Sequence, residues 1–194
     1  IQNIAIGQSP ADGSDIVTAT SYDEFGRETK QYLPFVANSN GMFVEDAINQ
    51  QHVFYNNSTN DVAVISNPYN ETLYEASPSN RVIEQASPGS EWAIGSGHTV
   101  RSSLSFKDNF LRNDIIDENG VLNTEITDLL GKVRVSIKAT GTDQESETHY
   151  AYDDFDRPKT ITSPAGVYRY EYDERNRITR KYIPGKGWEL FVYD

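Results

Sequence analysis

The sequence contains no cysteine, which excludes structural disulfides and metal sites with cysteine ligands. It has no apolar run of 18 residues, so we predict no membrane insertion by this segment. Basic residues are scarce: 17 Lys and Arg stand against 29 Asp and Glu, giving a formal net charge of −12. Phosphate binding needs a clustered basic surface, so nucleic acid is not expected as a partner.

The sequence begins at Ile1 with neither an initiator methionine nor a signal peptide, and we expect it to be a segment of a longer polypeptide. The acidity is uneven. Residues 1–150 hold 9 Lys and Arg against 21 Asp and Glu, whereas residues 151–194 hold 8 of each. The charge balance therefore changes near residue 150. The absence of cysteine is compatible with both reducing and oxidising compartments.

Histidine is also scarce, and its few positions do not predict a metal site. His52, His98 and His149 lie far apart without ligand spacing. Ser96 lies between two glycines but outside a G-x-S-x-G motif, which favours a glycine-rich loop over a nucleophile. No metal or other cofactor is therefore predicted.

Two acidic patterns are better explained as turns than as chemistry. The run 117–120 resembles part of a calcium loop, but Ile126 stands where a carboxylate ligand is required. Glu24, Asp154 and Glu174 recur at one position of a repeated motif, as turn residues do, rather than as a catalytic pair. We therefore predict that the chain is not an enzyme.

Tyrosine is unusually frequent, with 12 residues against 8 Phe and a single Met. Tyrosine fits the half-buried surface of a strand better than the interior of a helical bundle. Hydrophobic residues make up 37% and charged residues 24%, which is typical of a polar chain that still folds. The composition favours a mainly β protein.

An internal repeat dominates the sequence. Three segments of 13 residues align without gaps, each from a tyrosine to a proline: Tyr22–Pro34, Tyr152–Pro164 and Tyr172–Pro184. A fourth copy opens with Tyr193 and Asp194, and a degenerate copy without the tyrosine occupies Thr127–Val133. These segments predict repeated β-hairpins.

The repeat has four characteristic columns. It opens with a tyrosine at Tyr22, Tyr152 and Tyr172. An aspartate suited to bonding the turn backbone follows at Asp23, Asp128, Asp153 and Asp173. A residue type that tolerates positive φ in a tight turn stands at Gly26, Gly131, Asp156 and Asn176. A basic residue then begins the returning strand at Arg27, Lys132, Arg157 and Arg177. We leave open whether these cations pair with acids on the neighbouring repeat or remain solvated.

The run Tyr168–Tyr172 alternates tyrosines with charged residues, as a strand with two unlike faces does. Stacked hairpins are expected to align such tyrosines into cross-strand ladders. A unit of this length cannot bury its apolar face alone, so each repeat needs neighbours. Pro158, directly after a basic column residue, indicates an edge or bulge.

The segments between the repeats contain one predicted helix. Residues 43–55 place apolar side chains at helical spacing and are expected to pack on the sheet. Residues 77–99, rich in Ser, Gly and Pro, predict an extended loop before a strand over 99–106. Residues 117–120 predict a turn within a meander.

The Y-D-x-x-G/N-R core resembles the YD repeat of Rhs proteins and teneurins. The run A-D-G-S-D-I-V-T-A-T-S-Y-D-E-F-G-R-E-T-K-Q-Y-L-P resembles the segment that opens the repeat region of bacterial secreted Rhs-like proteins, and R-V-I-E-Q-A-S-P-G-S-E-W and G-S-G-H-T-V resemble their N-terminal module. In such proteins the repeats wind into a long sheet that curls into a hollow shell, in some cases enclosing a toxic C-terminal domain. The resemblance covers nearly the whole chain.

We therefore predict a mainly β fold: stacked antiparallel hairpins forming part of a curved open sheet, with one short helix near 43–55. Residues 1–141 are expected to form an acidic β-rich N-terminal module with partial and degenerate repeats, and residues 147–194 the YD repeats, although one continuous unit is also open. The resemblance implies a non-catalytic segment of a secreted or surface-displayed shell that encloses or presents another domain.

An alternative function is carbohydrate binding, which YD repeats have been associated with. Exposed aromatic rings stack on sugars, and the candidates are Tyr168, Tyr170, Trp188 and Trp92. The expected partners are flanking repeats and a C-terminal domain of the same polypeptide, with glycans as a further option. An extracellular or cell-surface location is implied by the resemblance.

Overall fold

A computed structural model describes residues 1–10, 12–59 and 62–194. The chain divides into two compact units: Ile1–Ser102 with Asp117–Gly120, and Ser103–Ile116 with Val121–Asp194. The strands join in the order β1-β2-β3-β5-β6-β7 and then in chain order to β15, with β4 paired to β2. The paired strands whose register is resolved all run antiparallel. The predicted mainly β, open antiparallel sheet with one short helix is confirmed.

The first unit contains the helix and the strands from β1 to the start of β7. Its elements are β1 (Gln2–Ala5), β2 (Asp15–Tyr22), β3 (Glu28–Tyr32), β4 (Phe35–Ala37), α1 (Ala47–Tyr55), β5 (Tyr69–Tyr74), β6 (Val82–Ala86), the 3-10 turn η1 (Ser90–Trp92) and the start of β7 (Val100–Lys107).

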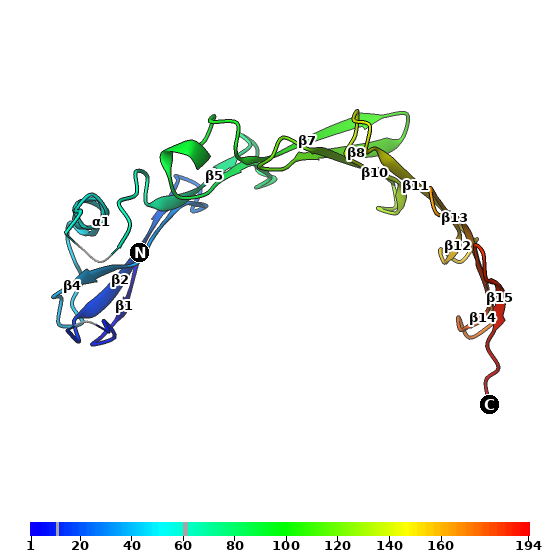
Figure 1. The fold of residues 1–194 in the computed structure, drawn as a ribbon, viewed down its shortest axis with the longest axis horizontal. Helices are drawn as coiled ribbons and strands as arrows, with labels where there is room; N and C mark the ends of the chain where they lie inside the picture. The colour runs from blue at the N-terminus through cyan, green and yellow to red at the C-terminus, as the bar shows by residue number, and fades with distance from the viewer. Residues whose placement is uncertain (11, 60–61) are drawn as a thin grey trace. The chain divides into compact units, whose positions relative to one another are not determined.

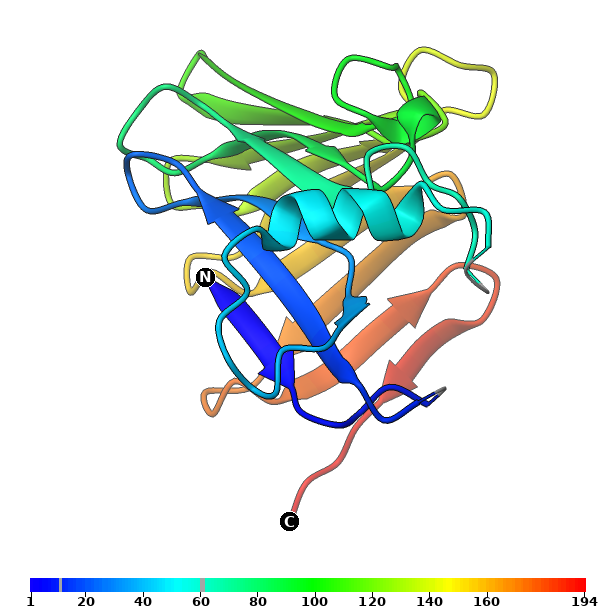
Figure 2. The same cartoon turned by 90° about the vertical axis from the view of Figure 1, so that its left-hand side faces the viewer.

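The buried core of the described chain lies between α1 and the strands β2, β3 and β4. Its members are Val17, Ala19, Tyr32, Phe35, Val44, Ala47 and Tyr55. Val17 and Ala19 alternate along β2, so one face of this strand is buried, as period-2 alternation requires. Figure 2 shows α1 lying across β2, which it contacts together with β4.

The helix begins later than the sequence predicted. Its first residue is Ala47, and its buried side chains are Ala47, Gln51 and Tyr55, which recur every fourth residue on one face. Val44, which falls within the predicted helix 43–55, is buried but precedes the helix, whereas Ile48 is 40% exposed. The helix therefore packs on the sheet through a narrower face than its apolar pattern suggested.

A buried carboxylate joins three segments of the first unit. Asp15 accepts hydrogen bonds from the Ser39 hydroxyl and from the backbone N–H groups of Gly41 and Gly7, the last two at 2.8 and 2.9 Å. The Ser39 hydroxyl first, and then the two N–H groups, hold the pKa of Asp15 below its ordinary value. Asp15 therefore remains an anion that closes the loops around the core.

The second unit consists of hairpins that follow one another along the chain (Figure 1). Its strands after β7 are β8 (Phe110–Ile116), β9 (Leu122–Asp128), β10 (Val133–Lys138), β11 (Ser146–Tyr152), β12 (Pro158–Ser163), β13 (Gly166–Tyr172), β14 (Ile178–Ile183) and β15 (Gly187–Leu190). Residues 152–164 and 172–184 form neighbouring antiparallel hairpins, as predicted.

Each repeat carries a register shift beside its turn. The shift lies at Tyr152 opposite Pro158, as the proline indicated, but it recurs at Tyr22 and Tyr172, whose partners are Glu28 and Ile178. The bulge is therefore a property of the repeat and not of the proline.

Two predictions about the connecting segments need correction. Residues 77–99 are not one loop, because β6 occupies Val82–Ala86 and pairs with β5. The expected tyrosine ladder is also absent at its central position, where Ile161 of β12 lies between Tyr150 and Tyr168. Tyr150 and Tyr168 therefore each have the aliphatic Ile161 as their cross-strand neighbour instead of another ring.

The helix contact gives a prediction about stability. Gln51 is fully buried and donates its amide N–H to the carbonyl oxygens of Leu33, at 3.3 Å, and Pro68, at 2.5 Å. We expect Gln51→Leu to lower the free energy of unfolding by about 1–3 kcal/mol, because the substitution removes both hydrogen bonds of a buried amide; the Pro68 carbonyl keeps the backbone N–H of Leu33, at 2.9 Å, as a donor, whereas the Leu33 carbonyl loses the Gln51 amide. Urea denaturation measures the change. The matched control is Gln50→Leu on the exposed side of the helix; an equal effect of both substitutions would contradict the prediction.

Candidate functional site

Each repeat turn is built around one aspartate carboxylate. In the last complete repeat, Asp173 Oδ1 accepts the backbone N–H groups of Arg175 and Arg177, both at 2.9 Å, while its Oδ2 pairs with Nε of Arg177 at 2.7 Å. Asp153 and Asp23 make the same three contacts. A carboxylate at this position satisfies two turn donors and one cation at once.

The residue before each basic residue adopts positive φ, as the sequence predicted. Asp156 has φ 64° and Asn176 has φ 61°, while Gly26 and Gly131 lie at 74° and 78°. Asp and Asn tolerate this region better than other residues with a Cβ.

The degenerate repeat keeps the turn but changes the cation. Asp128 accepts the N–H groups of Leu130 and Lys132, both at 2.9 Å. Its second oxygen pairs with Arg134, two residues further on, at 2.7 Å. Lys132 instead donates to the carbonyl oxygen of Asp156 in the next turn, at 3.1 Å.

The opening tyrosine of a repeat reaches back to the hairpin before it. Tyr172 donates its hydroxyl to the carbonyl oxygen of Pro158 at 2.8 Å, and Tyr152 donates to that of Val133 at 2.9 Å. Tyr193 makes the same bond to Ile178 at 2.8 Å. In every case the acceptor is the residue directly after the basic column. Partial burial raises the pKa of Tyr152 and of Tyr172, so both hydroxyls stay protonated donors.

The tyrosine ring also covers the preceding cation. The guanidinium carbon of Arg157 lies 4.6 Å from the ring centre of Tyr172, and that of Arg177 lies 4.3 Å from Tyr193. Arg157 Nη1 further donates to the carbonyl oxygen of Asp173 at 3.2 Å. We call this set, one ring over one cation plus one hydroxyl-to-carbonyl bond, the tyrosine–arginine junction.

The strand register explains why these two side chains meet. Thr160 pairs with Arg169 between the antiparallel strands β12 and β13. Three residues before Thr160 is Arg157 and three residues after Arg169 is Tyr172, so the same register places these two residues opposite each other. Backbone pairing therefore brings the columns of two successive repeats together. The basic column follows both courses: Arg27, Arg157 and Arg177 pair with the aspartate of their own turn, whereas Lys132 pairs with Asp156 of the neighbouring repeat at 3.3 Å. The other face of each of these arginines lies against the tyrosine of the next repeat.

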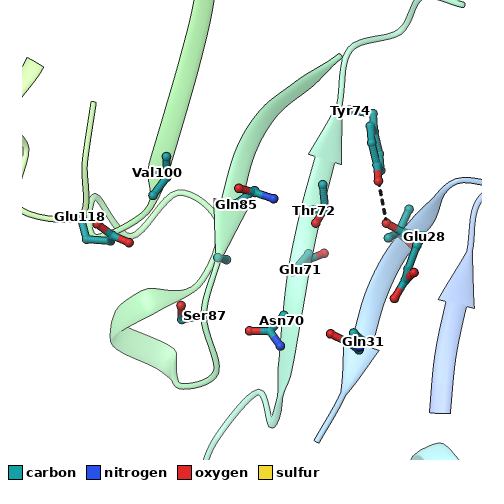
Figure 3. A pocket seen from close by; sticks show the side chains of 12 residues that line it. Glu28, Gln31, Asn70, Glu71, Thr72, Tyr74, Gln85, Ser87, Val100 and Glu118 are labelled. Carbon is teal, nitrogen blue, oxygen red and sulfur yellow. Dashed lines mark hydrogen bonds between the residues drawn. The ribbon is translucent and has the colours of Figure 1, made fainter. Parts of the chain in front are cut away.

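A further repeat escaped the sequence analysis. Tyr74 donates its hydroxyl to the carbonyl oxygen of Glu28 at 3.1 Å (Figure 3), and its ring centre lies 4.9 Å from the guanidinium carbon of Arg27. The following turn has Asn80 at φ 54° and pairs Arg81 with Glu75 at 2.8 Å. Glutamate in place of aspartate and two additional turn residues concealed the motif; the surviving signal was Tyr74 followed by Asn80-Arg81.

The four aromatic residues proposed to bind sugar do not form one surface. Tyr168 and Tyr170 share one face of β13. Trp188 pairs with Tyr182, which pairs with Arg169, so it lies on the opposite face. Trp92 belongs to the first unit, where its ring packs edge-on against His98, with 5.6 Å between ring centres.

The first unit contains an open cavity of about 450 Å³ against β3, β5 and β6. Figure 3 shows its mainly polar lining, which includes the side chains of Gln31, Asn70, Thr72 and Gln85. Its carboxylate Glu71 pairs with Lys30 at 3.5 Å. The residues that line it include Ser87 and Glu118 but no histidine.

The histidines have local contacts. His52 packs beside Tyr32 and Tyr69, and His149 lies 3.1 Å from Glu147. Across residues 1–10, 12–59 and 62–194, His, Cys, Asp and Glu form no cluster of three or more that is arranged to hold a metal ion. In the same described part of the chain, none of the helices has the length and apolar character that crossing a membrane requires.

The tyrosine–arginine junction gives a prediction with a matched control. We expect Tyr172→Phe to lower the free energy of unfolding by about 0.5–1.5 kcal/mol, because the substitution removes one hydrogen bond to Pro158 and keeps the ring. Tyr170→Phe removes a hydroxyl from the same strand outside the junction and should change stability less. Chemical denaturation measures both, and a larger loss for Tyr170→Phe would contradict the assignment.

The turn aspartates give a prediction about pH. The backbone N–H of Arg177, followed by its guanidinium, holds the pKa of Asp173 below its ordinary value despite partial desolvation. A depressed native pKa stabilises the fold fully above the unfolded value of about 3.9, and the stabilisation is lost as pH falls through that value toward the native one.

We therefore expect Asp173→Asn to destabilise the protein at pH 7 and the difference from the parent to shrink at pH 3. Denaturation at a series of pH values measures it. Glu174→Gln, at the adjacent exposed turn position, removes the same charge without the turn bonds and serves as the control. A pH-independent difference between parent and Asp173→Asn would contradict the assigned role of the charge.

Comparison with known proteins agrees with this geometry. None of the curated proteins matches the chain. The family model described as RHS Repeat matches residues 152–185, which contain the turns built around Asp153 and Asp173. The family model described as a domain of unknown function (DUF6443) matches residues 1–106, more than half of the chain. The chain therefore belongs to the DUF6443 family and is an Rhs-type YD-repeat protein, with that module followed by repeats.

Proposed function

We propose that this chain is a non-catalytic wall segment of a secreted or surface-displayed YD-repeat shell, which encloses or presents another domain of the same polypeptide. The observation that carries the proposal is the recurrence of the tyrosine–arginine junction at four hairpin interfaces, where Tyr74, Tyr152, Tyr172 and Tyr193 bind the preceding hairpin. The repeated tyrosine and arginine side chains attach each hairpin to the hairpin before it.

The recurring polar groups already have partners within the protein. The turn carboxylates bind backbone donors and arginines, and the arginines carry tyrosine rings on their other face. A catalytic group needs a free position for substrate, and these groups do not offer one. The resemblance of the repeats to Rhs proteins supports the location and the enclosing role.

The separation of the four candidate aromatics favours the wall over the glycan-binding alternative. A sugar-binding platform requires rings on one accessible surface, whereas Trp188 and the pair Tyr168 and Tyr170 lie on opposite faces of the sheet. We expect no selective binding when the protein is titrated against a glycan array. Selective binding that is lost in Trp188→Ala or Tyr170→Ala would overturn the structural proposal in favour of the alternative.

The enclosing role is tested in the full polypeptide by limited proteolysis. We expect Tyr152→Ala combined with Tyr172→Ala to expose the remainder of the polypeptide to protease, because two junctions of the wall are weakened. Tyr168→Ala combined with Tyr170→Ala is the matched control, since it removes two tyrosines outside the junctions. If the junction variant unfolds more easily while the protease resistance of the other domain is unchanged, the wall does not enclose that domain.

A further inference from the structure

The connections between successive repeats contain a close contact between a proline and a glycine. Gly166, the first residue of β13, adopts φ 122°, and a Cβ at this position would lie 2.7 and 2.8 Å from Cβ and Cγ of Pro184. Pro184 directly follows β14, which pairs with β13. Carbon atoms that are not bonded do not approach so closely, so the proline ring occupies space that a side chain at position 166 would need.

The next repeat begins its strand with a glycine at the same place. Gly166 and Gly187 each stand six residues before the opening tyrosine of a repeat, and Gly187 is the first residue of β15. Gly187 also has positive φ, 87°, but a Cβ there would meet no described atom within 4 Å. The corresponding residue one repeat earlier is Ser146, so the glycine is a feature of the last two repeats.

The strand β15 offers backbone groups on the side away from β14. In the sheet formed by the described residues it is the last strand and pairs with β14 alone. The Phe191 N–H donates to the Thr179 carbonyl oxygen at 2.9 Å, and in an antiparallel pair alternate residues direct their backbone groups toward the same neighbour. The backbone groups of Trp188 and Leu190 therefore point to the outer edge, which can pair with a further strand.

We propose that β15 is an acceptor edge for a strand that ends in proline, with Gly187 as the position that recognises the proline. The proposal continues the β13–β14 interface: a strand added to β15 in the register of β14 on β13 brings its final proline beside Gly187, as Pro184 lies beside Gly166. Backbone pairing binds any strand, whereas the glycine favours proline, whose ring fills the open space and whose φ is already fixed. This goes beyond the wall function, because it names what the edge selects and holds whether or not the wall encloses a domain.

A synthetic peptide with the sequence of residues 176–185, which contains β14 and its proline, tests the selection in trans. Titrated into the intact chain, it is expected to shift the amide NMR signals of Trp188 and Leu190. The Pro184→Ala version of the peptide should bind about tenfold more weakly, because two ring methylenes no longer fill the space. Equal affinity of the two peptides, or binding that leaves the β15 signals unchanged, would overturn the proposal. So would a dimer of the chain alone that the peptide does not dissociate in sedimentation experiments, because the edge would then select a second copy.

Two glycine substitutions in the protein locate the selection. Gly187→Ala places a Cβ in the acceptor space, and we expect this variant to bind both peptides about equally. Gly185→Ala is the matched control, because Gly185 lies in the same turn with φ 76° and open surroundings, so its substitution strains the backbone in the same way without filling the acceptor position. It should keep the preference of about tenfold for proline. A preference that survives in Gly187→Ala would overturn the assignment.

The contact within the chain gives a measurement that needs no peptide. We expect Gly166→Ala to raise the equilibrium constant for unfolding about tenfold more in the parent than in the Pro184→Gly background, which lacks both ring atoms that the new Cβ would meet. Strain from the positive φ is common to both backgrounds and cancels in the comparison. Equal effects in the two backgrounds would show that proline and glycine do not interact, and the proposal would lose its basis.

Discussion

The stacking of a tyrosine on the arginine of the preceding hairpin is the interaction on which the repeats depend. Among the described residues of the second unit, Thr124 alone is fully buried, so a conventional hydrophobic core does not hold these hairpins together. Backbone ladders join strands but do not distinguish one register from another. The tyrosine–arginine junction supplies both cohesion and register, because ring and hydroxyl meet their partners in a single alignment.

Arginine has two roles that lysine cannot combine. In Arg157 one edge of the guanidinium pairs with Asp153 within the turn, while its face carries Tyr172 and Nη1 reaches the next turn. The planar group with several donors allows this division. The degenerate repeat illustrates the alternative: Lys132 reaches forward to Asp156, and a second cation, Arg134, must take over the aspartate. Turn formation and attachment to the next hairpin are therefore coupled through one side chain.

The first unit is organised differently, because it has a helix to bury one face of its strands. Its core around Val17 and Tyr32 is closed by α1, and Asp15 ties the loops beside it. The same repeat turn nevertheless occurs at Asp23 and again, altered, at Glu75. Both units thus use the same turn to join hairpins, although among the described residues the buried hydrophobic cluster lies in the first unit.

The sequence by itself determined the turns, since all groups of a turn lie within five residues. It predicted the role of the aspartate column, the positive φ at Asp156 and Asn176, and the mainly β fold. Tertiary structure decided what the tyrosines contact, because strand register is a long-range property: Tyr74 meets Glu28 across 46 residues, and Ile161 intervenes where a tyrosine ladder was expected. It also decided that Val82–Ala86 is a strand, since so short a segment becomes a strand when a neighbouring strand offers backbone partners.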